Sequence, residues 1–162
     1  MPTFEKLNVQ APPKTMWAPG RLYSNFQDAP WDNKRWPNFI AAEFACKCNK
    51  YCSGEYYHDE QFLDRLQFAR KKFNMPIKIN SGHRCSLHNA AVGGAPLSMH
   101  KSIAVDISTR GFNDYYRSKL LRACQEAGFK GFGFYSNWLH VDLGRARIWF
   151  IGKGRQIWQS LI

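Results

Sequence analysis

The chain has 162 residues, 44% of them hydrophobic, which suits one globular domain with its own core and argues against general disorder. No apolar run approaches the ~20 residues of a membrane-spanning helix, so we expect no membrane insertion. The formal net charge of +11 favours a polyanionic partner, either nucleic acid or a wall polymer rich in carboxylates, although a merely solvated surface stays open. Because the basic residues are spread along the chain, we expect no nucleic-acid partner.

Residues 1–38 are predicted to be an N-terminal extension, and residues 39–162 the main domain. The extension holds six of the eight prolines and has weak hydrophobic periodicity, so no long helix or strand is expected there. Trp17, Trp31 and Trp36 should pack against the body rather than stand in water. The first residues lack the basic start and apolar middle of a signal peptide, so we expect synthesis in the cytoplasm.

Five cysteines in a chain without an export signal favour free thiols or a metal site over a disulfide framework. Cys46, Cys48 and Cys52 lie in one short segment. With His58 or Cys85 they could complete a structural zinc site. The spacing is not that of a standard zinc finger, so we favour unligated thiols over this second site.

The first long helix is predicted to begin at Asp59 and to end before Pro76. Its apolar residues recur at helical spacing, namely Phe62, Leu66, Ala69 and Phe73. Residues 77–80 alternate in polarity and predict a strand.

A second helix is predicted over residues 113–127, with Asn113 or Asp114 as its cap and Gly128 just past its end. Its apolar stripe consists of Tyr116, Leu120, Ala123 and Ala127. Residues 131–149 should form short strands and turns. The expected class is therefore α+β, a small antiparallel sheet with flanking helices.

Asp106 lies on a predicted strand whose two faces differ. Ile103, Val105 and Ile107 share one face, so Asp106 projects from the other between small residues. Such a carboxylate either binds a ligand or an ion, or is a hydrogen-bonded aspartate at the end of a sheet. Taken alone, the pattern leaves both interpretations open.

His140 and Asp142 project side by side from a second such strand, residues 138–143. A lone histidine on a strand is more often structural than a ligand. Two strands that both present ionisable groups favour a shared site. His100, Asp106 and His140 form a suitable ligand set for a catalytic zinc, with a fourth position for a water whose pKa the metal lowers toward ~7. No HExxH helix is present, which excludes that class of metalloprotease.

Several motifs occur in the order found in the zinc D-Ala-D-Ala peptidases and related murein endopeptidases. They are residues 81–84 (SGHR), 88–95 (HNAAVGGA), 98–106 (SMHKSIAVD), 131–135 (GFGFY) and 138–144 (WLHVDLG). Over roughly residues 39–150 the chain resembles this family, and residues 43–46 (EFAC) are similar to the opening of its phage-type members. The resemblance implies the hedgehog/D-Ala-D-Ala peptidase fold.

The resemblance also implies roles for single residues. His100, Asp106 and His140 would bind the zinc, Arg84 would hold the substrate carbonyl or the developing oxyanion, and Ser98 would line the substrate cleft. Without the family, a surface salt bridge is an equal alternative for Arg84.

The chain departs from the family pattern at two positions. Asp106 follows the first histidine by six residues, where family members usually have seven. Where many members carry a carboxylate as general base, three residues before the second histidine, this chain has Asn137. Asp142 is the nearest substitute and our candidate general base.

The leading hypothesis is a monomeric zinc peptidase that cleaves peptide bonds in peptidoglycan, namely a phage or prophage endolysin. It would reach the wall after release through another protein's pore, or as a virion component. The alternatives are a non-catalytic, zinc-containing module that binds the cell wall and, from charge alone, a nucleic-acid-binding protein.

Overall fold

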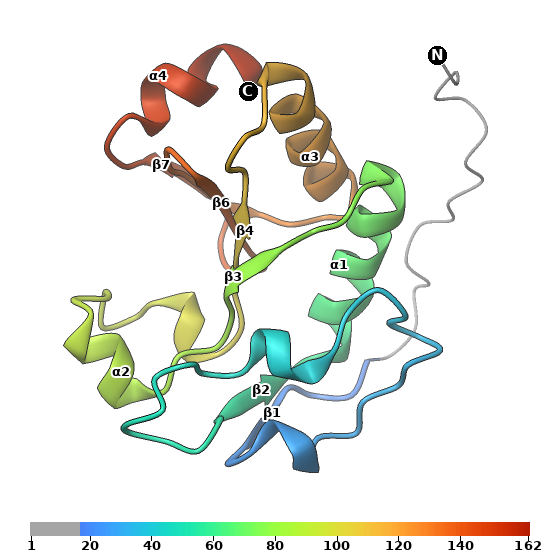
Figure 1. Cartoon of the computed structure of the whole chain (residues 1–162), viewed down its shortest axis with the longest axis vertical. Helices are drawn as coiled ribbons and strands as arrows, with labels where there is room; N and C mark the ends of the chain where they lie inside the picture. The colour runs from blue at the N-terminus through green and yellow to red at the C-terminus, as the bar shows by residue number, and fades with distance from the viewer. Residues whose placement is uncertain (1–16) are drawn as a thin grey trace.

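The structure is a computed structural model that describes residues 17–162 (Figure 1). A five-stranded sheet forms its centre, in the order β3 (Ile79–Ser81), β4 (Val105–Ser108), β6 (Trp138–Asp142), β5 (Gly131–Phe134) and β7 (Arg147–Phe150). Two long helices, α1 (Glu60–Phe73) and α3 (Asp114–Glu126), pack against each other beside it. The α+β class expected from the sequence is confirmed.

Shorter elements complete the described part of the chain. β1 (Arg21–Tyr23) pairs with β2 (Tyr56–His58) in a separate ribbon. The short helices are α2 (Ser86–Ala91), α4 (Gly154–Trp158) and the 3-10 helices Phe26–Asp28, Ala41–Phe44, Met99–Lys101 and Gln159–Leu161.

The sheet is mixed rather than purely antiparallel, which corrects one detail of the expectation. β5 and β6 form an antiparallel hairpin, and the turn at residues 143–146 reverses the chain again. β7 therefore runs in the same direction as β5. It pairs in parallel with β5, on the side that does not face β6. The pairs β3–β4 and β4–β6 are antiparallel as expected.

The two predicted helices are confirmed, and Asn113 is the one of the two predicted residues that caps the second. The Asp59 side chain accepts the Phe62 N–H at 3.0 Å and begins α1, which ends at Asn74 in the left-handed conformation. Asn113 caps α3 by accepting the Tyr116 N–H at 3.1 Å. β3 begins two residues later than predicted.

The core lies between the helices and one face of the sheet. Phe62, Leu66 and Phe73 of α1 meet Leu120 and other buried residues of α3 in one hydrophobic cluster. The cluster also takes in the apolar face of the two central strands, through Val105, Ile107, Leu139 and Val141. Asp106 and His140 alternate with these residues and so project from the opposite face of the sheet.

The indoles of Trp17, Trp31 and Trp36 all contact the body of the protein, as expected. Asp64 of α1 accepts hydrogen bonds from the Nε1 atoms of Trp17 and Trp36, both at 2.9 Å, and pairs with Arg35 at 2.7 Å. Trp31 packs against Trp36, with ring centroids 5.1 Å apart.

The rest of the expected extension, residues 1–16, lies outside the described residues, and the division of the chain at residue 38 stays a prediction. Within residues 17–162, no helix is both long enough and apolar enough to cross a membrane.

Candidate metal centre

The pairing of β4 with β6 brings the predicted metal ligands together. Asp106 and His140 are direct partners in the register of the two strands. His100 reaches them from the short helix Met99–Lys101, which the Ser98 side chain caps by accepting the His100 N–H at 3.2 Å. All three side chains offer a ligand atom to one shared point.

The donor atoms have the separations that a tetrahedral zinc requires. His100 Nε2 lies 3.3 Å from Asp106 Oδ1, and His140 Nδ1 lies 3.1 Å from both of these atoms. Nitrogen and oxygen ligands at about 2.0–2.1 Å from a tetrahedral zinc are about 3.3 Å apart. The three atoms therefore fit three of the four ligand positions of such a site.

The second nitrogen of each histidine is also engaged. His100 Nδ1 lies 2.6 Å from the backbone oxygen of Gly82, and His140 Nε2 lies 2.7 Å from Asp142 Oδ2. Each acceptor favours the tautomer whose proton is on that nitrogen. The lone pairs of His100 Nε2 and His140 Nδ1 then face the shared point, as metal ligation needs.

The electrostatics of the triad favour a cation. Burial alone would raise the pKa of Asp106, but hydrogen bonds from His100 and His140 outweigh it and hold that pKa well below its usual range. Burial alone would lower the pKa of His140, and the hydrogen bonds to Asp106 and Asp142 raise it instead. The carboxylate is thus ionised, and protons compete with a metal for His140.

The triad forms part of a pocket of about 430 Å³, which Arg84 and Ser98 also line. The structure therefore brings together every sequence-predicted site residue except Asp142. The Nε atom of Arg84 is buried and has no hydrogen-bond partner within residues 17–162. Arg84 also forms no ion pair within this part of the chain. Its guanidinium is available to a ligand rather than held in a surface salt bridge.

Asp142 lies behind His140 rather than in the pocket. Its side chain is fully buried, and Arg147 pairs with it at 2.7 Å. The backbone N–H of Gly144 donates to its Oδ1 at 2.9 Å. Burial alone would raise the pKa of Asp142, but the His140 and Arg147 bonds hold it well below the usual range. The carboxylate is fully engaged on the side of the imidazole that faces away from the triad.

Two glycines of β5 make room for these groups, a role that the sequence analysis missed. Gly131 is paired with Asp142 and Gly133 with His140. A Cβ at Gly131 would stand 2.3 Å from Asp142 Oδ1, and one at Gly133 would stand 2.5 Å from the Trp149 ring. The Trp149 ring lies 4.9 Å from the His140 ring and lines the pocket. The alternation of glycine and phenylalanine in residues 131–134 could have indicated a strand with one face free of side chains.

The predicted cysteine cluster gains Cys85 as its fourth member. The sulfur atoms of Cys46, Cys48, Cys52 and Cys85 all lie within 4.8 Å of one another. His58, the other candidate, lies apart and bonds the Tyr56 hydroxyl at 3.0 Å. The backbone N–H of Lys50 lowers the pKa of Cys48 to about 6, whereas burial raises that of Cys46 to about 12.

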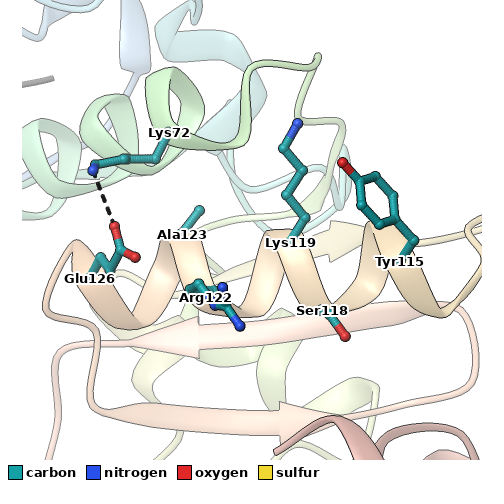
Figure 2. A pocket seen from close by; sticks show the side chains of 7 residues that line it. All are labelled: Lys72, Tyr115, Ser118, Lys119, Arg122, Ala123 and Glu126. Atoms are coloured by element: carbon teal, nitrogen blue, oxygen red, sulfur yellow. Dashed lines mark ion pairs between the residues drawn. The ribbon is translucent and has the colours of Figure 1, made fainter. Parts of the chain in front are cut away.

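Figure 2 shows a second pocket, of about 350 Å³, along α3. Lys72 of α1 and Glu126 of α3 form an ion pair at its edge, 3.3 Å long. The lining residues that the structure describes include neither histidine nor cysteine. The candidate ligand group His100, Asp106 and His140 lies at the other pocket.

Comparison with protein families agrees with this site. Residues 37–142, which include all three residues of the triad, match the family described as Peptidase M15. No curated protein matches the chain.

Proposed function

Because this chain belongs to the peptidase M15 family, we propose that it is a zinc-dependent peptidase that hydrolyses peptide bonds in bacterial peptidoglycan. One observation carries the proposal. His100, Asp106 and His140 place three donor atoms 3.1–3.3 Å apart in a pocket that Arg84 also lines.

In such a site, different residues of the chain would have different roles. A zinc ion held by the triad would polarise the scissile carbonyl and activate a water molecule for attack. Arg84 would hold the substrate carbonyl oxygen and stabilise the negative charge that develops on it. Gly82 and Asp142 keep the two imidazoles in the ligating tautomer.

The pocket suits a peptide substrate with anionic groups. Tyr135 and Trp138 stack on one another, 4.5 Å between ring centroids, and form an apolar wall. Arg84 supplies positive charge at the same pocket, whereas the charge of Arg147 is paired with Asp142. Together with the net charge of +11, this supports a carboxylate-bearing stem peptide of the wall, and we propose no nucleic-acid partner.

The test uses solvent-permeabilised bacterial cells. Zinc-loaded protein should clear the suspension, and chelator-stripped protein should not until zinc is restored. Mass spectrometry of digested sacculi should then show new peptide termini and unaltered glycan strands. Intact stem peptides after prolonged digestion with the zinc-loaded protein would refute the proposal.

A second possible function is non-catalytic binding to the wall. It is favoured because the described residues that line the pocket include no carboxylate free to act as general base. Among the described lining residues Asp106 is the sole carboxylate, and it belongs to the triad. Asn137 stands where many family members have a base. A wall-binding module would sediment with purified sacculi, depend on zinc for this binding, and release no peptide.

We further propose that the enzyme is a monomeric phage or prophage endolysin, made in the host cytoplasm, that acts on the wall after release or as a virion component. The similarity of residues 43–46 to phage-type members supports this origin. Expression inside bacteria should cause lysis only together with a pore-forming protein. Lysis without the pore would contradict this route to the wall.

A further inference from the structure

The four cysteines around Cys48 form a cluster that the proposed peptidase chemistry does not use. Cys48 Sγ lies 3.5 Å from Cys52 Sγ and 4.0 Å from Cys85 Sγ. Sulfur ligands at about 2.3 Å from a tetrahedral zinc lie about 3.8 Å apart. Cys46 completes the group, with all separations within 4.8 Å.

The backbone around the cluster brings residues that are distant in the sequence together, independently of any metal ligand. The His83 N–H donates to the Phe44 oxygen at 2.8 Å, so residues 82–85 run beside residues 44–46. Cys46 and Cys85 therefore fall at the same end of this pairing. Asn49, at φ 50°, turns the chain so that Cys52 returns to Cys48.

The segment that carries three of the cysteines has little else to hold it. Residues 46–55 contain no helix or strand. Within residues 17–162, the bond from the Cys46 N–H to the Glu55 oxygen, 2.8 Å, joins the two ends of the segment to each other, and the bond from the Phe26 N–H to the Gly54 oxygen, 2.9 Å, ties it to its surroundings. A zinc ion held by four side chains would bind the folded chain and not the unfolded one, so its binding free energy would stabilise this fold, as structural zinc sites do.

The charges of the segment suit a metal with four thiolates. Four thiolates around one divalent cation leave an excess of negative charge. Lys47 and Lys50 lie within the same segment. The Lys47 ammonium also donates to the Asn80 oxygen at 3.3 Å and so ties the segment to β3.

We propose that Cys46, Cys48, Cys52 and Cys85 bind a second, structural zinc ion that clamps residues 82–85 in place. This segment leads from the cluster to the metal pocket. Gly82 accepts from His100 Nδ1, and the Arg84 N–H donates to the His100 oxygen at 2.6 Å. The site does not rest on peptidase activity, because zinc would bind it whether or not the triad is catalytic.

Metal analysis of the full chain tests the site. Protein purified with zinc under reducing conditions should hold two zinc ions per chain. His140→Ala should hold one and Cys52→Ala should hold one, whereas Cys124→Ala, which removes a thiol of α3 outside the cluster, should keep two. A wild-type content of one, lost entirely in His140→Ala, would overturn the proposal.

Cobalt substitution keeps the test decisive even if Cys52→Ala fails to fold. Cobalt-loaded His140→Ala should retain the intense near-ultraviolet charge-transfer absorption of thiolate-bound cobalt. Absence of that absorption, or a Cys48–Cys52 disulfide in the non-reduced mass spectrum, would refute a four-thiolate site. If Cys52→Ala folds, the His83 and Arg84 amides should exchange with deuterium faster than in the wild type. Unchanged protection there would refute the clamp.

Discussion

Asp106 and His140 face each other across two neighbouring central strands, with Oδ1 of one 3.1 Å from Nδ1 of the other. The backbone ladder between β4 and β6 positions both residues. We therefore expect that single ligands can be replaced without loss of the fold.

His140→Ala should lose the triad zinc and all hydrolytic activity while the protein stays folded. The substitution removes one of three ligands but leaves the apolar face of β6 intact. Zinc content should fall by one ion per chain, with little change in far-ultraviolet circular dichroism. His88→Ala, the same change outside the triad, is the control and should keep metal and activity. Hydrolysis by metal-free His140→Ala would exclude the triad as the active site.

Arg84→Ala should slow the chemical step by roughly 10²–10³-fold, about 2.7–4 kcal/mol, as expected for the loss of an oxyanion donor. Its zinc content should not change, because the guanidinium is not a ligand. Single-turnover rates on a defined stem peptide measure the effect, and Arg110→Ala at the exposed surface is the matched control. If KM alone rises, Arg84 binds substrate equally in the ground and transition states.

Asp142→Asn should weaken zinc affinity by roughly 10–100-fold, because the carboxylate orients His140 from the side facing away from the triad. The sequence suggested a general base, for which turnover would instead fall by ~10²–10⁴-fold with zinc affinity unchanged. Zinc affinity and turnover at saturating zinc, measured on one sample, separate the two roles. Asp114→Asn, at the exposed start of α3, is the control, and normal values of both quantities in Asp142→Asn would eliminate both roles.

Asp64→Asn should destabilise the protein by about 1–3 kcal/mol, because it leaves Arg35 and the indole donors of Trp17 and Trp36 poorly satisfied. Denaturant unfolding of this variant and of Asp28→Asn, an exposed control, would measure the difference. Equal stability of the two variants would mean that this contact does not anchor the N-terminal segment.

The Asp64 contribution should also depend on pH. Burial alone would raise the pKa of Asp64, but hydrogen bonds from Arg35, Trp17 and Trp36 outweigh it and lower the pKa. A lowered pKa gives stability that is complete above the unfolded value of ~3.9 and is lost as pH falls through the folded value. The stability difference between wild type and Asp64→Asn should therefore shrink below about pH 4. A difference that stays constant would argue against the ionised Asp64.

The sequence was most informative where one residue decides a local structure. The first long helix begins directly after Asp59, where its start was predicted, and Asn113, one of two predicted candidates, caps the second. Period-two alternation placed Asp106 and His140 on the polar face of the sheet. Such signals come from neighbouring residues and need no knowledge of the tertiary fold.

Contacts between distant segments could not be obtained in this way. The sequence named Cys85 and His58 as alternatives for the fourth member of the cysteine cluster. The choice of Cys85 depends on how residues 82–85 run beside residues 44–46, which no local pattern encodes. The position of Asp142 behind His140 depends on the ring rotamer and on Arg147. The six-residue helix α2 is too short to show a helical period.

The glycines of β5 have a consequence for engineering. Positions 131 and 133 leave space for Asp142 of β6 and Trp149 of β7, both of which contact His140, whereas Phe132 and Phe134 fill the interior. In a saturation library selected for activity, we expect positions 131 and 133 to admit glycine almost exclusively, and positions 132 and 134 to accept other large apolar residues. We expect changes in substrate range to come instead from residues 93–97, where exposed Leu97 borders the pocket and the backbone belongs to no strand.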